Sequence, residues 1–202
     1  NVFWELGRLE EAIASSQKAL FFRPKFAEAY SNLGVVFQEL GKLEEAVASC
    51  QNSLDIKPDY AKAHNNLGVA LKEQGKLEQA LESYQRALTI KPGFAEVHSN
   101  LGNLLREMGR LEEAVTSCDK AVDINPDLAD AHSHLGVVLQ NLGKLEEAFT
   151  SHRHAIALSP QNDIFWAGLA ASLEPLSFSS VDDNLWQDLL TLLERPTVHP
   201  SS

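Results

Sequence analysis

Seven histidines are the side chains of this 202-residue chain that first suggest chemistry. His64, His98 and His132 stand 34 residues apart, one in each unit of a repeating pattern. Side chains that lie a full repeat apart are too distant to share a metal ion. His132 and His152 could approach each other within one unit, but two histidines without a third ligand make a weak zinc site. We therefore expect no metal and no cofactor.

The chain also lacks the short motifs of common enzyme classes. It contains no glycine-rich phosphate loop, no nucleophile elbow and no metalloprotease helix signature. Adjacent glutamates such as Glu44 and Glu45 fall in the first turn of a predicted helix, where carboxylates favour the positive end of the helix dipole. We expect no catalytic residue and no enzymatic activity in this chain alone.

The overall charge narrows the classes of partner. A formal net charge of −11 disfavours nucleic acid, because a nucleic-acid binder needs cations that displace the counterions of phosphates. It disfavours anionic membranes for the same reason, and no apolar run is long enough to span a bilayer. Cys50 and Cys118 occupy equivalent positions two units apart, too far for a disulfide, and are expected to be small buried groups. We expect a soluble cytoplasmic protein.

The elements that position these residues recur with one period. Five prolines and five glycines are each spaced 34 residues apart: Pro24, Pro58, Pro92, Pro126 and Pro160, and Gly7, Gly41, Gly75, Gly109 and Gly143. Such a period indicates a stacked array of small units. We predict a partial repeat at 1–24, complete repeats at 27–60, 61–94, 95–128 and 129–162, a degenerate repeat with a capping helix at 163–195, and a linker-like tail at 196–202.

Each repeat has the pattern of two antiparallel helices. In the repeat 61–94, apolar residues three or four positions apart form one stripe from Ala63 to Leu71 and another from Leu77 to Leu88.

Glycine and proline mark the ends of these helices. Gly75 suits the left-handed turn after the first helix, and Pro92 ends the second. In the partial repeat we expect Gly7 to end one helix and residues 9–22 to form the next.

A second set of glycines lies within the first helices. Glycine in a helix interior costs about 1 kcal/mol relative to alanine, so its recurrence implies that another backbone comes close. We expect these glycines to face small residues of the second helix: Gly34, Gly68, Gly102 and Gly136 against Ala46, Ala80, Ala114 and Ala148.

The pattern Leu67-Gly68, Ala80, Tyr84, Ala87 and Pro92 resembles the tetratricopeptide repeat. The resemblance covers about residues 1–174 and recurs in all four complete repeats. It implies an all-α, right-handed superhelical solenoid whose first helices line a concave groove. In that family the groove holds an extended peptide or a partner helix. One position of the first helix is often aromatic in the family, and we expect its occupants here to pack between the two helices: Tyr30, His64, His98, His132 and Trp166.

The family's geometry places one polar side chain per repeat on the groove floor: Asn32, Asn66, Asn100 and His134. A carboxamide both donates and accepts a hydrogen bond, so it can pair with a peptide backbone in either sense. This set resembles the asparagine ladder in the repeat arm of O-linked N-acetylglucosamine transferases. The alternative is that asparagine is simply common at this position of the repeat. Six further polar residues would flank the ladder: Asn65, Asn103, Gln38, Lys72, Arg106 and Gln140.

Another groove type in this family clamps a C-terminal carboxylate with cations and asparagines. Here the second positions of the first helices are Glu28, Lys62, Glu96 and Asp130. Three of these four side chains are acidic and would repel a carboxylate. We predict that this clamp is absent.

Two functional hypotheses follow from the sequence. The leading one is a non-enzymatic scaffold that binds a protein segment in the concave groove. The alternative is the substrate-recruiting arm of a larger glycosyltransferase or methyltransferase. Its basis is a start within a repeat and the ending 195–200, which resembles the junction between repeats and catalytic region in O-linked N-acetylglucosamine transferases.

Self-association is a third hypothesis. The partial first repeat would expose Phe3, Trp4 and Leu6 on an uncapped helix face, and such faces can stack end to end.

Overall fold

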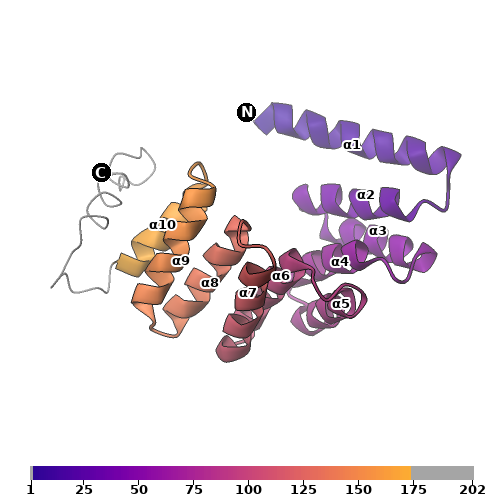
Figure 1. The fold of residues 1–202 in the computed structure, drawn as a ribbon. Helices are drawn as coiled ribbons and strands as arrows, with labels where there is room; N and C mark the ends of the chain where they lie inside the picture. The colour runs from indigo at the N-terminus through magenta and orange to yellow at the C-terminus, as the bar shows by residue number, and fades with distance from the viewer. Residues whose placement is uncertain (1, 174–202) are drawn as a thin grey trace.

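The structure, a computed structural model, describes residues 2–173. Within that range it contains helices and no strand, which confirms the predicted all-α solenoid of helix pairs. The helices are α1 (Val2–Phe22), α2 (Ala27–Glu39), α3 (Leu43–Ile56), α4 (Ala61–Glu73), α5 (Leu77–Ile90), α6 (Ala95–Glu107), α7 (Leu111–Ile124), α8 (Ala129–Asn141), α9 (Leu145–Leu158) and α10 (Asp163–Leu173). They follow one another as antiparallel pairs along a curved stack (Figure 1).

The turn inside each complete repeat is made by a glycine in the left-handed region. Gly41, Gly75, Gly109 and Gly143 have φ angles of 70°, 75°, 76° and 74°. At Gly75 the turn is closed by two backbone bonds of 2.9 Å, from Gly75 N to Lys72 O and from Lys76 N to Leu71 O. These bonds satisfy carbonyls that the helix end leaves without partners, as the position of glycine predicted.

The corresponding turn at Gly7 was predicted and is absent. Helix α1 runs without a break from Val2 to Phe22, through Gly7. A Cβ added at Gly7 would meet no atom within 4 Å, and the same is true at Gly75, so contacts at the glycine itself do not account for the difference. A glycine at this position therefore permits the turn but does not impose it. Figure 1 shows α1 as a single rod at the N-terminal end of the stack.

The two helices of each repeat approach closely at the mid-helix glycines. A Cβ at Gly34 would lie 3.3 Å from the carbonyl oxygen of Ala46, and one at Gly102 would lie 3.1 Å from that of Ala114. The predicted approach to the alanine backbone is therefore present in these two repeats.

The residue four positions beyond each alanine fills the contact with the glycine. Cys50, Tyr84, Cys118 and His152 are all fully buried there. Burial raises the pKa of both thiols to about 12, so they are neutral packing groups and not nucleophiles.

The three histidines predicted to pack between the helices make a polar contact that the sequence did not predict. His64, His98 and His132 are only half-buried. The Nε2 atom of each ring lies 2.8–2.9 Å from the carbonyl oxygen of the proline six residues earlier: Pro58, Pro92 and Pro126. In the fifth repeat Trp166 Nε1 donates to Pro160 O at 2.9 Å. The side chain at this position of the first helix therefore links that helix to the loop that precedes it.

Of the segment 163–195, predicted as a degenerate repeat with a capping helix, the structure describes α10 alone. The predicted capping helix and the tail at 196–202 lie outside the described residues.

Substitution of Gly102 by alanine tests the close approach of the two helices. The added methyl would meet Cys118 Sγ and the backbone oxygen of Ala114, so relief requires backbone movement. We expect Gly102→Ala to lower the free energy of unfolding by about 1–3 kcal/mol, although alanine gains about 1 kcal/mol in helix propensity. Urea unfolding measures the change. Gly93→Ala is the control, because a Cβ there meets nothing within 4 Å and no loss is expected. Equal stability of the Gly102 variant and wild type would contradict the packing described here.

Substitution of His152 tests a buried imidazole. The ring is fully buried between Gly136 and Gly168, neither nitrogen bonds to a residue within 2–173, and burial lowers its pKa from 6.5 to about 4. Because the folded state keeps this imidazole neutral, the unfolded state binds its proton more readily. The free energy of unfolding therefore decreases as the pH falls below the pKa of the unfolded state.

We therefore expect wild type to lose up to about 3 kcal/mol more than His152→Cys between pH 6.5 and pH 4. Cysteine is the residue that two other repeats place in this position. Urea unfolding of both proteins across this pH range gives the difference. Parallel pH profiles would show that the imidazole is not buried.

Candidate functional site

The first helices form the inner layer of the curved stack. In addition to the hairpin contacts, α2 contacts α4, α4 contacts α6, α6 contacts α8 and α8 contacts α10. Among the described residues, no two second helices contact each other as extensively. An inner arc is shorter than an outer arc, so the helices that touch across repeats lie on the concave side. The predicted groove residues lie on these first helices.

The ladder residues are hydrogen-bonded from one repeat to the one before. Asn66 Nδ2 donates to Ser31 Oγ at 3.0 Å and approaches Ser31 O at 3.4 Å. Asn100 Nδ2 donates to Asn65 Oδ1 at 3.0 Å. Each bond spans 35 residues and joins successive first helices.

His134 continues the same pattern. Its Nδ1 lies 2.8 Å from Ser99 Oγ, again 35 residues away. Burial lowers the pKa of this imidazole, so the ring is neutral at pH 7. Asn32, at the start of the series, is exposed.

These bonds determine which atoms of the ladder can meet a partner. The Nδ2 groups of Asn66 and Asn100 are used between repeats, whereas no described residue bonds to their Oδ1 atoms. The two amides are half-buried. The expected pairing in both senses is therefore reduced to acceptance at Asn66, whose Nδ2 makes two bonds to Ser31, whereas Asn100 keeps one N–H donor as well as its oxygen.

The ladder bonds form one row of polar contacts across the first helices. A second row of polar contacts crosses the same helices closer to their C-termini. Gln38 Nε2 donates to Glu73 Oε1 at 2.7 Å, and Lys72 Nζ lies 3.5 Å from Glu107 Oε1. These bonds also join residues 35 positions apart.

The row continues toward the last repeats. Arg106 donates through Nε and Nη2 to Asn103 Oδ1 at 3.2 and 3.0 Å. Gln140 Nε2 donates to Gly168 O at 2.9 Å and to Ser172 Oγ at 2.7 Å. All six predicted flanking residues thus lie in the two rows of contacts.

Sequence reasoning missed the partners of these side chains: Ser31, Ser99, Glu73 and Glu107. The sequence did contain a sign of these contacts, because each of the four residues lies 35 positions from its partner. A search for polar pairs at one period plus one residue would have found them.

The histidine next to His132 differs from the one that the sequence suggested. His152 is buried between glycines, and the ring beside His132 is that of His154, with centroids 5.3 Å apart. Within residues 2–173, no group of three or more His, Cys, Asp or Glu side chains is placed to hold a metal ion.

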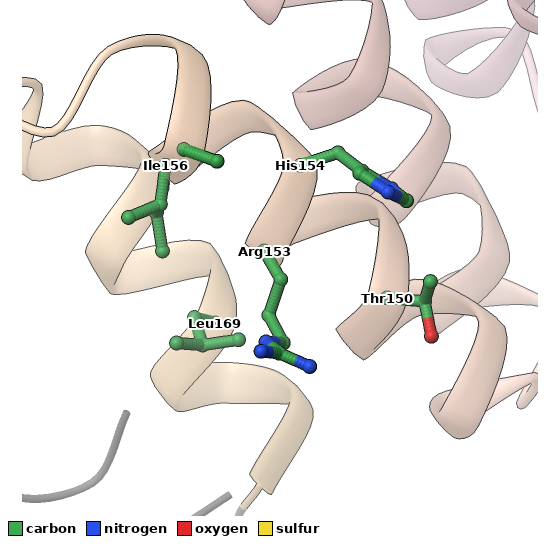
Figure 2. Close-up of a pocket in the computed structure, with 6 residues that line it drawn as sticks. Thr150, Arg153, His154, Ile156 and Leu169 are labelled. Carbon is green, nitrogen blue, oxygen red and sulfur yellow. The ribbon is translucent and has the colours of Figure 1, made fainter. Parts of the chain in front are cut away.

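A cavity of about 320 Å³ is lined by residues of α9 and α10. Figure 2 shows Arg153 and His154 extending from α9, with Leu169 on the neighbouring α10. The lining of this cavity includes none of the predicted site residues. The part of the chain that the structure describes also has no helix long and apolar enough to cross a membrane.

Comparisons with known families agree with the repeat pattern. Family models described as "Tetratricopeptide repeat" match residues 25–92, 83–116 and 128–159, and one described as "TPR repeat" matches 1–41 and 102–143. No curated protein matches the chain.

Several solved structures share the fold. TTC0263, a thermophilic TPR protein of Thermus thermophilus, is 25% identical with a TM-score of 0.73, over 85% of this chain and 93% of its own. YrrB, described as a TPR protein with an unusual peptide-binding site, is 25% identical with a TM-score of 0.59, over 83% and 86%. MamA is 23% identical with a TM-score of 0.63, over 78% and 92%.

Proposed function

Because the chain belongs to the tetratricopeptide repeat family, we propose that it is a non-enzymatic scaffold that binds an extended protein segment on its concave face. The first helices would contact the segment, and the second helices would support them from outside. The peptide-binding site described for YrrB is consistent with this proposal.

One observation carries the proposal: amide oxygens recur in register along the first helices. Asn66 and Asn100 each direct Nδ2 to the preceding repeat and leave Oδ1 without a bond to any described residue. Asn32 is exposed in the same register. An extended backbone presents N–H donors at regular intervals, so a regular series of acceptors suits it.

The inter-repeat bonds also favour tight binding. A side chain that is already held in place loses less conformational entropy when a partner binds. Ser31 and Asn65 hold the amides of Asn66 and Asn100 in this way.

The chain offers a matched pair of substitutions at the Asn66–Ser31 bond. Asn66→Ala removes the bond and the acceptor, whereas Ser31→Ala disrupts the same contact but keeps the Asn66 amide. We expect both to lower the free energy of unfolding by about 1 kcal/mol. Asn66→Ala should weaken peptide binding by about fivefold, which corresponds to one hydrogen bond. Ser31→Ala should weaken it less, because it loosens the Asn66 amide but keeps the acceptor oxygen.

Peptides for this test are selected from a random 12-residue library on the 202-residue chain, and affinity is measured by fluorescence polarisation. Equal losses of affinity in both variants would mean that Asn66 acts only through repeat packing. Unchanged affinity in both would remove the ladder from the binding site.

Other hypotheses from the sequence stay predictions. The described residues do not bear on a catalytic region beyond the repeats. Self-association through Phe3, Trp4 and Leu6 rests on side chains that lie outside the part of the structure described in detail.

A further inference from the structure

Two cations from successive first helices meet at a single carboxylate on the concave side. Lys72 Nζ on α4 and Arg106 Nη2 on α6 both lie 3.5 Å from Glu107 Oε1. The side chains of Lys72, Arg106 and Glu107 are 21%, 25% and 33% exposed. They are thus partly shielded but still open to a ligand.

In this arrangement two cations share one carboxylate. Other ion pairs of the chain, such as Arg110 with Glu113 and Lys144 with Glu147, join one cation to one carboxylate. The neighbouring acid of the same row, Glu73, accepts a hydrogen bond from the neutral amide of Gln38 at 2.7 Å and keeps its negative charge. No ion pair joins Glu73 to a described residue, so Glu107 is the carboxylate for which both cations compete.

The guanidinium of Arg106 is held in place by its own helix. Asn103 Oδ1 accepts bonds from Nε and Nη2, at 3.2 and 3.0 Å, and so restrains the Arg106 side chain. Nη1 bonds to no described residue. A guanidinium with free donors and a restrained plane is well suited to a carboxylate.

His134 on α8 borders the same region. The positive charges of Lys72 and Arg106 add to burial in lowering its pKa, while Asp130 opposes them. Side chains of three successive repeats therefore act on one another across the concave face. The neutral imidazole adds no charge, and its Nε2 can donate or accept a hydrogen bond, depending on the tautomer.

We propose that Lys72 and Arg106 form a subsite that binds an acidic side chain, the carboxylate of an Asp or Glu within the extended partner segment. The proposal rests on the groove function given above. In the free protein Glu107 is the internal counter-ion, at the long distance of 3.5 Å from both cations. A ligand carboxylate would form shorter charge-assisted bonds to Nζ and to the free guanidinium donors.

This subsite differs from the carboxylate clamp considered for the sequence. That clamp would use the first turns of the first helices, where Glu28, Glu96 and Asp130 lie. Lys72 and Arg106 lie in the last turns of α4 and α6. The ligand can therefore be a side chain in mid-segment, with no chain terminus required.

The probe for the test is the random 12-residue peptide library, selected in parallel on wild type and on Lys72→Gln/Arg106→Gln. We expect Asp and Glu to be enriched at one position of the peptides selected by wild type, and this enrichment to be lost with the variant. Lys76→Gln/Arg110→Gln is the charge-matched control, because it removes the same two charges from the exposed turns beside the groove and should keep the enrichment.

Affinities of one selected peptide and its Glu→Gln (or Asp→Asn) analogue complete the test. Lys72→Gln/Arg106→Gln should weaken the acidic peptide about tenfold or more and leave the neutral analogue nearly unaffected. Glu107→Gln should act in the opposite direction and strengthen the acidic peptide, because it removes the competing carboxylate. A purely structural role for these residues would not give opposite signs.

The possible outcomes separate this subsite from the groove function. Selected peptides without acidic enrichment, or enrichment that survives in Lys72→Gln/Arg106→Gln, would overturn the subsite while groove binding stands. Failure of wild type to select any peptide would overturn both proposals.

Discussion

The contact between a glycine of each first helix and a buried side chain of the second helix determines the rest of the architecture. At Gly102, for example, a Cβ would overlap Cys118 Sγ and lie 3.1 Å from Ala114 O, so the two helices lie close together. Because the contact recurs in each complete repeat, the hairpins are similar and stack with one curvature (Figure 1). That curvature brings the first helices together on the inner side, and side chains 35 residues apart then come within hydrogen-bonding distance.

Under the proposed function the inner surface would combine two roles in the same residues. The Asn66 and Asn100 amides join neighbouring repeats through Nδ2, and their oxygens would bind the partner. Lys72 and Arg106 share Glu107 between repeats and would bind an acidic side chain. Binding would then be coupled to the stiffness of the array, because a ligand on these side chains would also act on the contacts between repeats.

Much of the fold could be predicted because it depends on local chemistry repeated at a fixed period. The positive φ angles at Gly75 and its equivalents follow from glycine's tolerance of the left-handed region. Other features were not predictable from residue type alone. Gly7 is the same residue as Gly75, but the helix continues through it, because glycine permits a left-handed turn without imposing one. His64 fits the family's aromatic position, but the apolar pattern did not predict that its ring would contact the Pro58 carbonyl oxygen in the preceding loop.

The candidate site was predictable in position but not in its bonding. The family resemblance placed Asn66 and Asn100 on the inner surface, yet it could not show which of their atoms would bond to the neighbouring repeat. That choice depends on Ser31 and Asn65, whose distance in sequence hides their contact. The shared carboxylate of Glu107 was missed for the same reason.

A crystal structure of the chain with a selected peptide tests the central claim most directly. The account predicts an extended peptide along the first helices, with backbone N–H groups within hydrogen-bonding distance of Asn66 Oδ1 and Asn100 Oδ1. The bonds from their Nδ2 atoms to Ser31 and Asn65 should persist in the complex. A peptide bound on the second helices, or one that contacts the first helices without using either amide oxygen, would contradict the account.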